Sequence, residues 1–164
     1  MSERSDKRHL AFPTSNSSAH RLLQHNPDAH NTEVDESTKP LRLIIVEDSH
    51  CYALRLRGRL AAIPEVEVVG AAESPALAID LLQSTRPDVI LLDLNLRHGS
   101  GTGVLRYIRQ AGIDVRVIVM TSDPHTELRE SCFSLGAHSF FDKFTLLQHL
   151  PAELDSFRGE LLNG

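Results

Sequence analysis

The chain has 164 residues, of which 41% are hydrophobic and 24% are charged, as is typical of a soluble globular protein with a buried core. The net charge of -5 argues against a protein that binds nucleic acid mainly through the phosphates. No apolar run approaches the roughly 20 residues that span a bilayer, and no secretory signal is visible. The 2 cysteines are too few for a disulfide framework or a zinc site. We therefore expect a cytoplasmic protein without membrane insertion.

The composition changes near Pro40. Residues 1–40 are rich in Ser, Asn, His and acidic residues, and their few apolar residues have no period. Such a segment buries too little apolar surface to offset its ordering entropy, so we expect a disordered polar tail. We interpret its histidines as solvated, because no single helical face holds His9, His20, His25 and His30.

From Leu41 onward, apolar runs typical of strands alternate with stretches typical of helices. The pattern predicts five strands, over 41–47, 66–71, 88–92, 115–120 and 139–141. The first two helices are predicted over 50–63 and 75–85, and the third begins among 99–103 and ends at Gly112. The fourth is predicted over 124–135, closed by Gly136, and a final helix follows the last strand. Ser74 and Pro75 are typical of a helix start. The final helix has one apolar stripe, made of Leu147, Leu150, Leu154, Phe157 and Leu161.

Five strand–helix units within residues 41–164 predict one α/β domain, with helices on both faces of a parallel sheet. The apolar run 88–92 is typical of a strand that is buried on both faces. Right-handed crossovers leave few topologies, and the doubly wound, flavodoxin-like order 2-1-3-4-5 is the common solution for five strands. In this order the ligand crevice lies at the carboxyl ends of the first and third strands.

Acidic residues lie at these two strand ends. Glu47 and Asp48 end the first strand and Asp93 ends the third, so three carboxylates should converge. Their mutual repulsion is costly unless a cation joins them, and hard oxygen ligands select Mg²⁺ or a similar ion. Because Mg²⁺ commonly binds through carboxylates together with a phosphate oxygen, this cluster indicates a phosphoryl-transfer centre.

Two further polar residues belong to the same edge. Thr121 ends the fourth strand and can offer a hydroxyl, and Lys143 follows the fifth strand. Lys143 is the only lysine in residues 41–164, which makes its place at this edge informative. Its ammonium is a compact point charge on a flexible stem, suited to binding a phosphoryl group.

In this order and spacing, Glu47, Asp48, Asp93, Thr121 and Lys143 resemble the receiver domain of bacterial two-component response regulators, over essentially all of residues 41–164. The resemblance, which is to single-domain, chemotaxis-regulator-like members, implies that Asp93 is the phospho-acceptor. It implies a Mg²⁺ ion held by Glu47, Asp48, Asp93 and the backbone carbonyl of Asn95. It also implies that Thr121 and Lys143 bind phosphoryl oxygens, and that Thr121 and Phe140 form the switch.

The same resemblance implies the partners. A sensor histidine kinase or a histidine phosphotransfer protein would supply the phosphoryl group, and an unknown downstream protein would receive the signal, without direct DNA binding. A homodimer would form through the helix over 124–135, the strand over 139–141 and the final helix. Since only the 21 residues 144–164 follow Lys143, we expect a stand-alone regulator that is not an enzyme, beyond assisting its own phosphorylation and dephosphorylation.

Two residues depart from the family pattern. Phe144 stands where a proline in a cis peptide bond is usual, and Arg97 stands where another proline is common. Three alternatives remain: a degenerate receiver that binds proteins without phosphorylation, a phosphatase or mutase with an aspartyl nucleophile, and a flavin-binding module. An aspartyl phosphatase usually has a second acid where Asn95 stands, and a flavin-binding module would need a phosphate-binding loop where Glu47 and Asp48 stand.

Other side chains have simpler interpretations. Cys51 and Cys132 are expected to be small buried hydrophobic residues. The run of arginines in the first helix is expected to form a solvated face, made of Arg55, Arg57 and Arg59.

Overall fold

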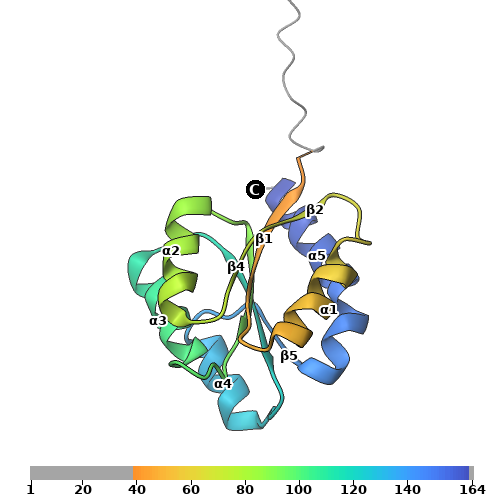
Figure 1. Cartoon of the computed structure of the whole chain (residues 1–164). Helices are drawn as coiled ribbons and strands as arrows, with labels where there is room; N and C mark the ends of the chain where they lie inside the picture. Colours follow the sequence, from red (N-terminus) through yellow and green to blue (C-terminus); the bar gives the residue numbers. More distant parts are fainter. Residues whose placement is uncertain (1–38, 163–164) are drawn as a thin grey trace, which may run out of the picture. The chain divides into compact units, whose positions relative to one another are not determined.

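The computed structural model describes residues 39–162, so the predicted tail over 1–40 lies outside the described residues apart from its last two positions. Strands and helices alternate along the whole described part (Figure 1). The strands are β1 (Leu41–Val46), β2 (Val66–Ala72), β3 (Val89–Asp93), β4 (Arg116–Thr121) and β5 (Ser139–Asp142). The helices are α1 (His50–Leu60), α2 (Pro75–Thr85), α3 (Gly101–Ala111), α4 (Thr126–Ser134) and α5 (Lys143–Leu162).

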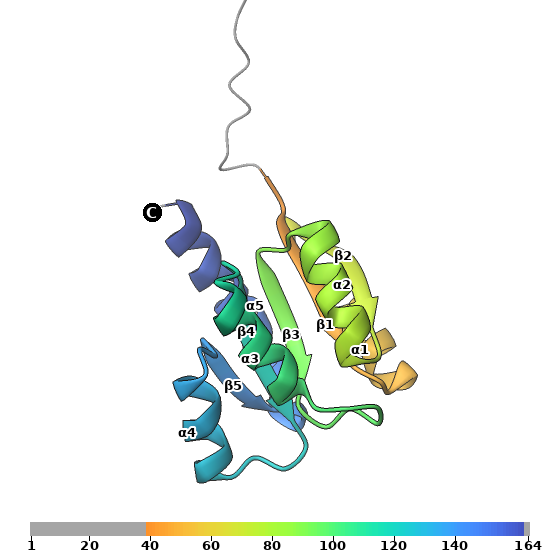
Figure 2. The ribbon, with the colours of Figure 1, turned by 90° about the vertical axis from the view of Figure 1, so that its left-hand side faces the viewer.

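The five strands form one sheet in the order β2-β1-β3-β4-β5, with every neighbouring pair parallel. The order confirms the predicted doubly wound topology. Figure 2 shows the strands side by side, with their carboxyl ends at the same edge. Val46 of β1 pairs with Leu92 of β3. Glu47 and Asp93, the residues that come directly after this pair, therefore lie side by side at the edge of the sheet.

Helices cover both faces of the sheet. Figure 1 shows α1 and α5 on one side of the strands and α2, α3 and α4 on the other. Each face has its own apolar core: Leu56 of α1 and Leu150 of α5 belong to one cluster of buried residues, and Leu82 of α2 and Leu105 of α3 belong to the other. β3 is buried along its whole length, as predicted for a strand between two helical layers.

The helix ends follow local chemistry. Ser74 caps α2 by accepting a hydrogen bond from the amide of Leu77, and Gly112 ends α3 in the left-handed conformation (φ 61°), in agreement with the sequence. Several ends differ from the prediction by one residue, and two helix ends differ by two residues or more. α1 ends at Leu60 rather than at 63, and α4 begins at Thr126 rather than at Pro124 because the side chain of His125 caps it.

The buried stripe of α5 was predicted partly wrongly. Leu146 is fully buried, whereas Leu147 is only partly buried and Leu161 is 43% exposed. The stripe therefore starts one residue earlier and ends at Phe157. A helix of 20 residues is about 30 Å long, while the six residues of β4 span about 20 Å, so the last turn of α5 extends beyond the strand.

The two cysteines differ in exposure. Cys132 is buried as predicted, but Cys51 is exposed. The buried face of α1 contains Leu56 and Leu60, and Cys51 precedes the corresponding position of the previous turn, so it points away from the sheet. The predicted solvated face is confirmed, with all of its members exposed: Arg55, Arg57 and Arg59. Within residues 39–162, none of the helices combines the length and the hydropathy that a membrane span needs.

Candidate functional site

The structure brings three carboxylates together at the carboxyl edge of the sheet. Glu47 and Asp48 follow β1 and Asp93 ends β3, and one oxygen of each lies within 4.8 Å of the others. Glu47 is 4% exposed and Asp93 is 1% exposed. Buried carboxylates this close require compensating positive charge or hydrogen bonds.

Lys143 provides positive charge from the first turn of α5. Its ammonium donates a hydrogen bond to Asp93 Oδ2 at 2.8 Å and forms an ion pair with Glu47 Oε2 at 2.7 Å. Burial by itself would lower the pKa of Lys143, but the contacts with Asp93 and Glu47 outweigh burial, so the pKa lies above its usual value. Lys143 therefore remains charged and bridges the two buried acids.

Glu47 has a second partner that fixes its orientation. Its Oε1 accepts a hydrogen bond from the backbone N–H of Ser49 at 3.0 Å. Burial nevertheless raises the pKa of Glu47, because the contacts with Lys143 and Ser49 offset only part of the desolvation. A divalent cation at this position would favour the ionised carboxylate.

Thr121 is connected to Asp93 through Asn95. The backbone N–H of Asn95 donates to Asp93 Oδ1 at 3.1 Å, and its side-chain amide donates to Thr121 Oγ1 at 3.3 Å. The same hydroxyl oxygen accepts the N–H of Asp123 at 3.2 Å, and Thr121 is fully buried. The end of β4 and the nucleophile candidate on β3 therefore belong to one hydrogen-bond network.

The two adjacent phenylalanines of β5 lie on opposite faces of the sheet. Phe140 is 5% exposed in the core beneath α4, where the guanidinium of Arg129 lies 5.7 Å from its ring centroid and donates to its carbonyl at 3.2 Å. Phe141 packs on the α5 side, stacked on His149 with centroids 5.6 Å apart. The switch candidate Phe140 is therefore turned inward.

The partner of Asp48 is Arg97, which no pattern in the sequence indicates. The backbone N–H of Arg97 donates to Asp48 Oδ2 at 2.8 Å, and its Nε lies 3.2 Å from the same oxygen. Arg97 had been noted only as a departure from the family pattern. A loop residue 49 positions along the chain gives no periodic signal of this contact.

Tyr52 is a second residue that sequence analysis missed. Its hydroxyl donates to the backbone carbonyl of Lys143 at 2.8 Å, and its ring centroid lies 5.0 Å from the Lys143 ammonium. Burial, followed by the charge of Glu47, raises the pKa of Tyr52 to about 12, so the phenol keeps its proton. Its spacing of four and eight residues from Leu56 and Leu60 could have indicated that it faces the sheet.

Gly101 allows the loop after β3 to close on the site. A Cβ at this position would lie 2.1 Å from the carbonyl oxygen of Asp93, which no side chain can tolerate. The N–H of Gly101 donates to Leu94 O at 3.1 Å. Only glycine permits this close approach of the α3 start to the end of β3.

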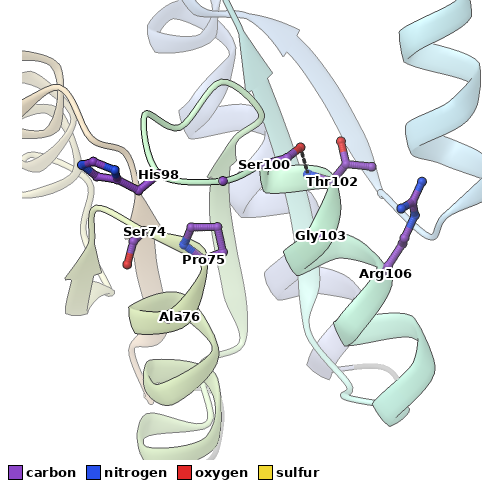
Figure 3. Close-up of a pocket in the computed structure, with 9 residues that line it drawn as sticks. Ser74, Pro75, Ala76, His98, Ser100, Thr102, Gly103 and Arg106 are labelled. Carbon is purple, nitrogen blue, oxygen red and sulfur yellow. Dashed lines mark hydrogen bonds between the residues drawn. The ribbon is translucent and has the colours of Figure 1, made fainter.

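A hollow at the same edge lies between the starts of α2 and α3 (Figure 3). Ser100 caps α3 by accepting the N–H of Thr102 at 3.2 Å, and Ser74 caps α2. His98 and Arg106, which also line the hollow, are exposed. The hollow is therefore formed by the starts of two capped helices, and the carboxylate cluster does not line it.

The carboxylate cluster matches the chemistry of a magnesium site. Glu47, Asp48 and Asp93 offer oxygen ligands, which Mg²⁺ prefers. Among residues 39–162, this is the one group of three or more His, Cys, Asp or Glu side chains close enough to hold a metal ion. The donor set thus fits a hard divalent cation, and three carboxylates would leave coordination positions of Mg²⁺ for other oxygen ligands.

Comparison with known proteins gives a consistent result. The family model for the response regulator receiver domain matches residues 43–155. The chain is 31% identical over 110 residues to the protein-glutamate methylesterase/protein-glutamine glutaminase of Treponema pallidum, covering 66% of this chain and 27% of that protein. It is 27% identical over 105 residues to the nitrate/nitrite response regulator protein NarL of Escherichia coli, covering 64% of this chain and 49% of that protein.

A solved structure shows the same fold. The response regulator domain of Thermotoga maritima CheB superposes with a TM-score of 0.65 at 24% identity, covering 74% of this chain and 96% of that one. This chain spans 27% of the Treponema protein and 49% of the E. coli protein. The likeness to these longer proteins therefore concerns one of their parts.

Proposed function

This chain belongs to the response regulator receiver domain family, and from this premise we propose that Asp93 accepts a phosphoryl group from a phosphohistidine. The donor would be a sensor histidine kinase or a histidine phosphotransfer protein. We assign this role to a receiver domain over residues 41–164 and treat 1–40 as a separate polar tail. The observation that carries the proposal is the contact of Lys143 with both Asp93 and Glu47 beside Asp48.

In the proposed reaction, a carboxylate oxygen of Asp93 attacks the phosphorus atom. A new O–P bond forms as the P–N bond to the donor imidazole breaks, and the imidazole keeps the electron pair of that bond. Lys143 is already 2.8 Å from Asp93 Oδ2, so its positive charge lies where negative charge accumulates on the transferred group. Later attack by water on the acyl phosphate would return the Asp93 carboxylate and release inorganic phosphate.

Glu47, Asp48 and Asp93 would hold Mg²⁺, and the backbone carbonyl of Asn95 is proposed as a further ligand. When bound, the ion supplies charge neutralisation for phosphoryl transfer. Thr121 and Lys143 would bind phosphoryl oxygens, and movement of Thr121 would be transmitted to Phe140 in the neighbouring strand. The register that pairs Val119 with Phe140 and Thr121 with Asp142 supports this coupling.

We propose that the output is a phosphorylation-dependent protein interaction rather than DNA binding or catalysis by the receiver itself, in a stand-alone cytoplasmic regulator. The surface of α4, β5 and α5 is the candidate for a downstream protein or for a homodimer. Phe133 of α4 is 39% exposed, so this helix has an apolar side chain available to a partner. The methylesterase and glutaminase activities named for one relative belong to a protein of which this chain spans 27%.

Incubation with a small acyl phosphate tests the proposed function. We expect intact-mass analysis to show one added phosphoryl group in the presence of Mg²⁺ and none after chelation. Absence of a Mg²⁺-dependent adduct would favour the alternative, a degenerate receiver that binds its partner without phosphorylation. Release of the bound phosphoryl group as fast as it is transferred would instead appear as catalytic phosphate production, as in an aspartyl phosphatase.

Arg97 should weaken magnesium binding. Its guanidinium contacts Asp48, one of the residues that would hold the ion, although its side chain is 72% exposed, and exposed ion pairs contribute little. We therefore expect Arg97→Ala to increase Mg²⁺ affinity by about threefold, measured by titration calorimetry. Arg59→Ala, which removes the same charge from the last turn of α1, is the control; an equal gain in both variants would show a general charge effect.

A further inference from the structure

Tyr52 contacts both the main chain and the ammonium group of Lys143. Its hydroxyl donates to the Lys143 carbonyl at 2.8 Å, and its ring lies 5.0 Å from the Lys143 ammonium. A lysine side chain is otherwise a flexible four-carbon stem with many rotamers. One tyrosine therefore restricts the main chain of Lys143 and the position of its charge.

Given the proposed phosphoryl transfer, we propose that Tyr52 is a positioning residue, which keeps the Lys143 ammonium on the oxygen of Asp93. The distances form a continuous path, because the same ammonium that faces the Tyr52 ring lies 2.8 Å from Asp93 Oδ2 and 2.7 Å from Glu47 Oε2. The ammonium side chain is 13% exposed, so water competes little with the ring. Attraction between a cation and an aromatic face is stronger in such a shielded place.

The residue next to Lys143 in α5 has little side-chain packing to hold Lys143 in place. Lys143 is the first residue of α5, directly after β5, and the next side chain, Phe144, is 81% exposed. Phe144 therefore contributes little packing that could hold this turn. Tyr52, which comes from α1 on the same face of the sheet, provides the hydrogen bond to Lys143 from outside α5.

A purely structural role would give a different result from a positioning role. Tyr52 also packs at the border of the core between α1 and α5, and a packing residue would change the free energy of unfolding without changing the chemistry of folded molecules. Tyr52→Phe keeps the ring and loses the hydrogen bond, whereas Tyr52→Leu loses both contacts. Tyr107→Phe is the matched control, since the only other tyrosine bonds Gln83 between α2 and α3.

The first measurement does not depend on phosphorylation. The chain has three lysines, Lys7, Lys39 and Lys143, so selective ¹⁵N labelling gives a simple spectrum of side-chain ammonium groups, assigned with Lys143→Met. We expect the Lys143 signal to show a ring-current shift that remains in Tyr52→Phe and is lost in Tyr52→Leu. The same Lys143 shift in Tyr52→Leu and in the unmodified chain would overturn the contact in solution.

The second measurement is the rate of adduct formation with an acyl phosphate at saturating Mg²⁺. We expect a rate about threefold lower in Tyr52→Phe and at least about tenfold lower in Tyr52→Leu, with the rate of Tyr107→Phe unchanged. Adding Tyr52→Leu to Lys143→Met should cause no further loss of rate. Unchanged rates in Tyr52→Phe and Tyr52→Leu would overturn the positioning role. So would a loss of rate on adding Tyr52→Leu to Lys143→Met that equals the loss caused by Tyr52→Leu alone. Failure of the unmodified chain to form any adduct would reject the proposed function, while the ammonium spectrum would still report on the contact.

Discussion

Asp93→Asn should abolish the phosphoryl adduct completely. The substitution replaces the carboxylate nucleophile with an amide of nearly the same shape, and an amide oxygen is too weak a nucleophile to form the acyl phosphate. The amide oxygen can still accept the N–H of Asn95, which donates to Asp93 Oδ1 at 3.1 Å. Lys143 retains its ion pair with Glu47 at 2.7 Å, so we expect the variant to fold. Intact-mass analysis after incubation with an acyl phosphate and Mg²⁺ measures the loss.

The matched control makes the same chemical change at a surface position. Asp80 is exposed on α2, and Asp80→Asn should form the adduct at the rate of the unmodified chain. The adduct on Asp93 should also be released by hydroxylamine, which attacks acyl phosphates. An adduct of unchanged yield in Asp93→Asn would mean that another side chain is the acceptor, and the assignment of Asp93 would be wrong.

The fold was accessible to sequence analysis because its signals are local. The apolar run before Asp93 indicates a strand buried on both faces, and the cap at Ser74 and the terminator at Gly112 mark helix ends that the structure confirms. The carboxylates could be placed for the same reason. A residue that ends a parallel strand must lie at one edge of the sheet, whatever its side-chain conformation.

Contacts between elements were less accessible, because they depend on how each helix is rotated about its axis. Leu146 and Leu147 lie four and three residues before the buried Leu150, so both spacings fit the same helical face, and only Leu146 is fully buried. The same uncertainty affects Cys51, which was wrongly predicted to be buried. The bond between Tyr52 and Lys143 joins residues 91 positions apart. Neither residue type identifies the other as its partner.

The path of a loop was equally inaccessible. Arg97 reaches Asp48 across 49 positions because the loop after β3 turns back over the end of β1. The sequence shows a glycine at 101 but not why it is needed, namely that a Cβ would lie 2.1 Å from the Asp93 carbonyl. Local patterns therefore predict which residues lie at the carboxyl edge of the sheet. The hydrogen-bond and ion-pair partners of each residue depend on the path of the folded backbone.

Lys143→Met should reduce the free energy of unfolding by about 3 kcal/mol when no divalent cation is present, because breaking a buried ion pair leaves charge without compensation. The carboxylate side chains of Glu47 and Asp93 are 0% and 1% exposed, and Lys143 contacts both. Methionine has a similar length, so the loss should arise mainly from charge rather than from a cavity. Lys39→Met, at an exposed position, is the control and should change the stability by less than about 0.5 kcal/mol.

Magnesium should restore much of this loss, because a divalent cation and the ammonium compensate the same carboxylates. A ligand that binds only the folded state stabilises it by about 2.7 kcal/mol at roughly 100 times its dissociation constant. In the unmodified chain the cation must share Glu47 and Asp93 with Lys143, whereas in Lys143→Met it meets no competing positive charge there. Denaturant unfolding with and without Mg²⁺ should therefore show a larger stabilisation in the variant. Equal stabilisation in both proteins would mean that the ion does not bind at these carboxylates, and the proposed magnesium site would have to be abandoned.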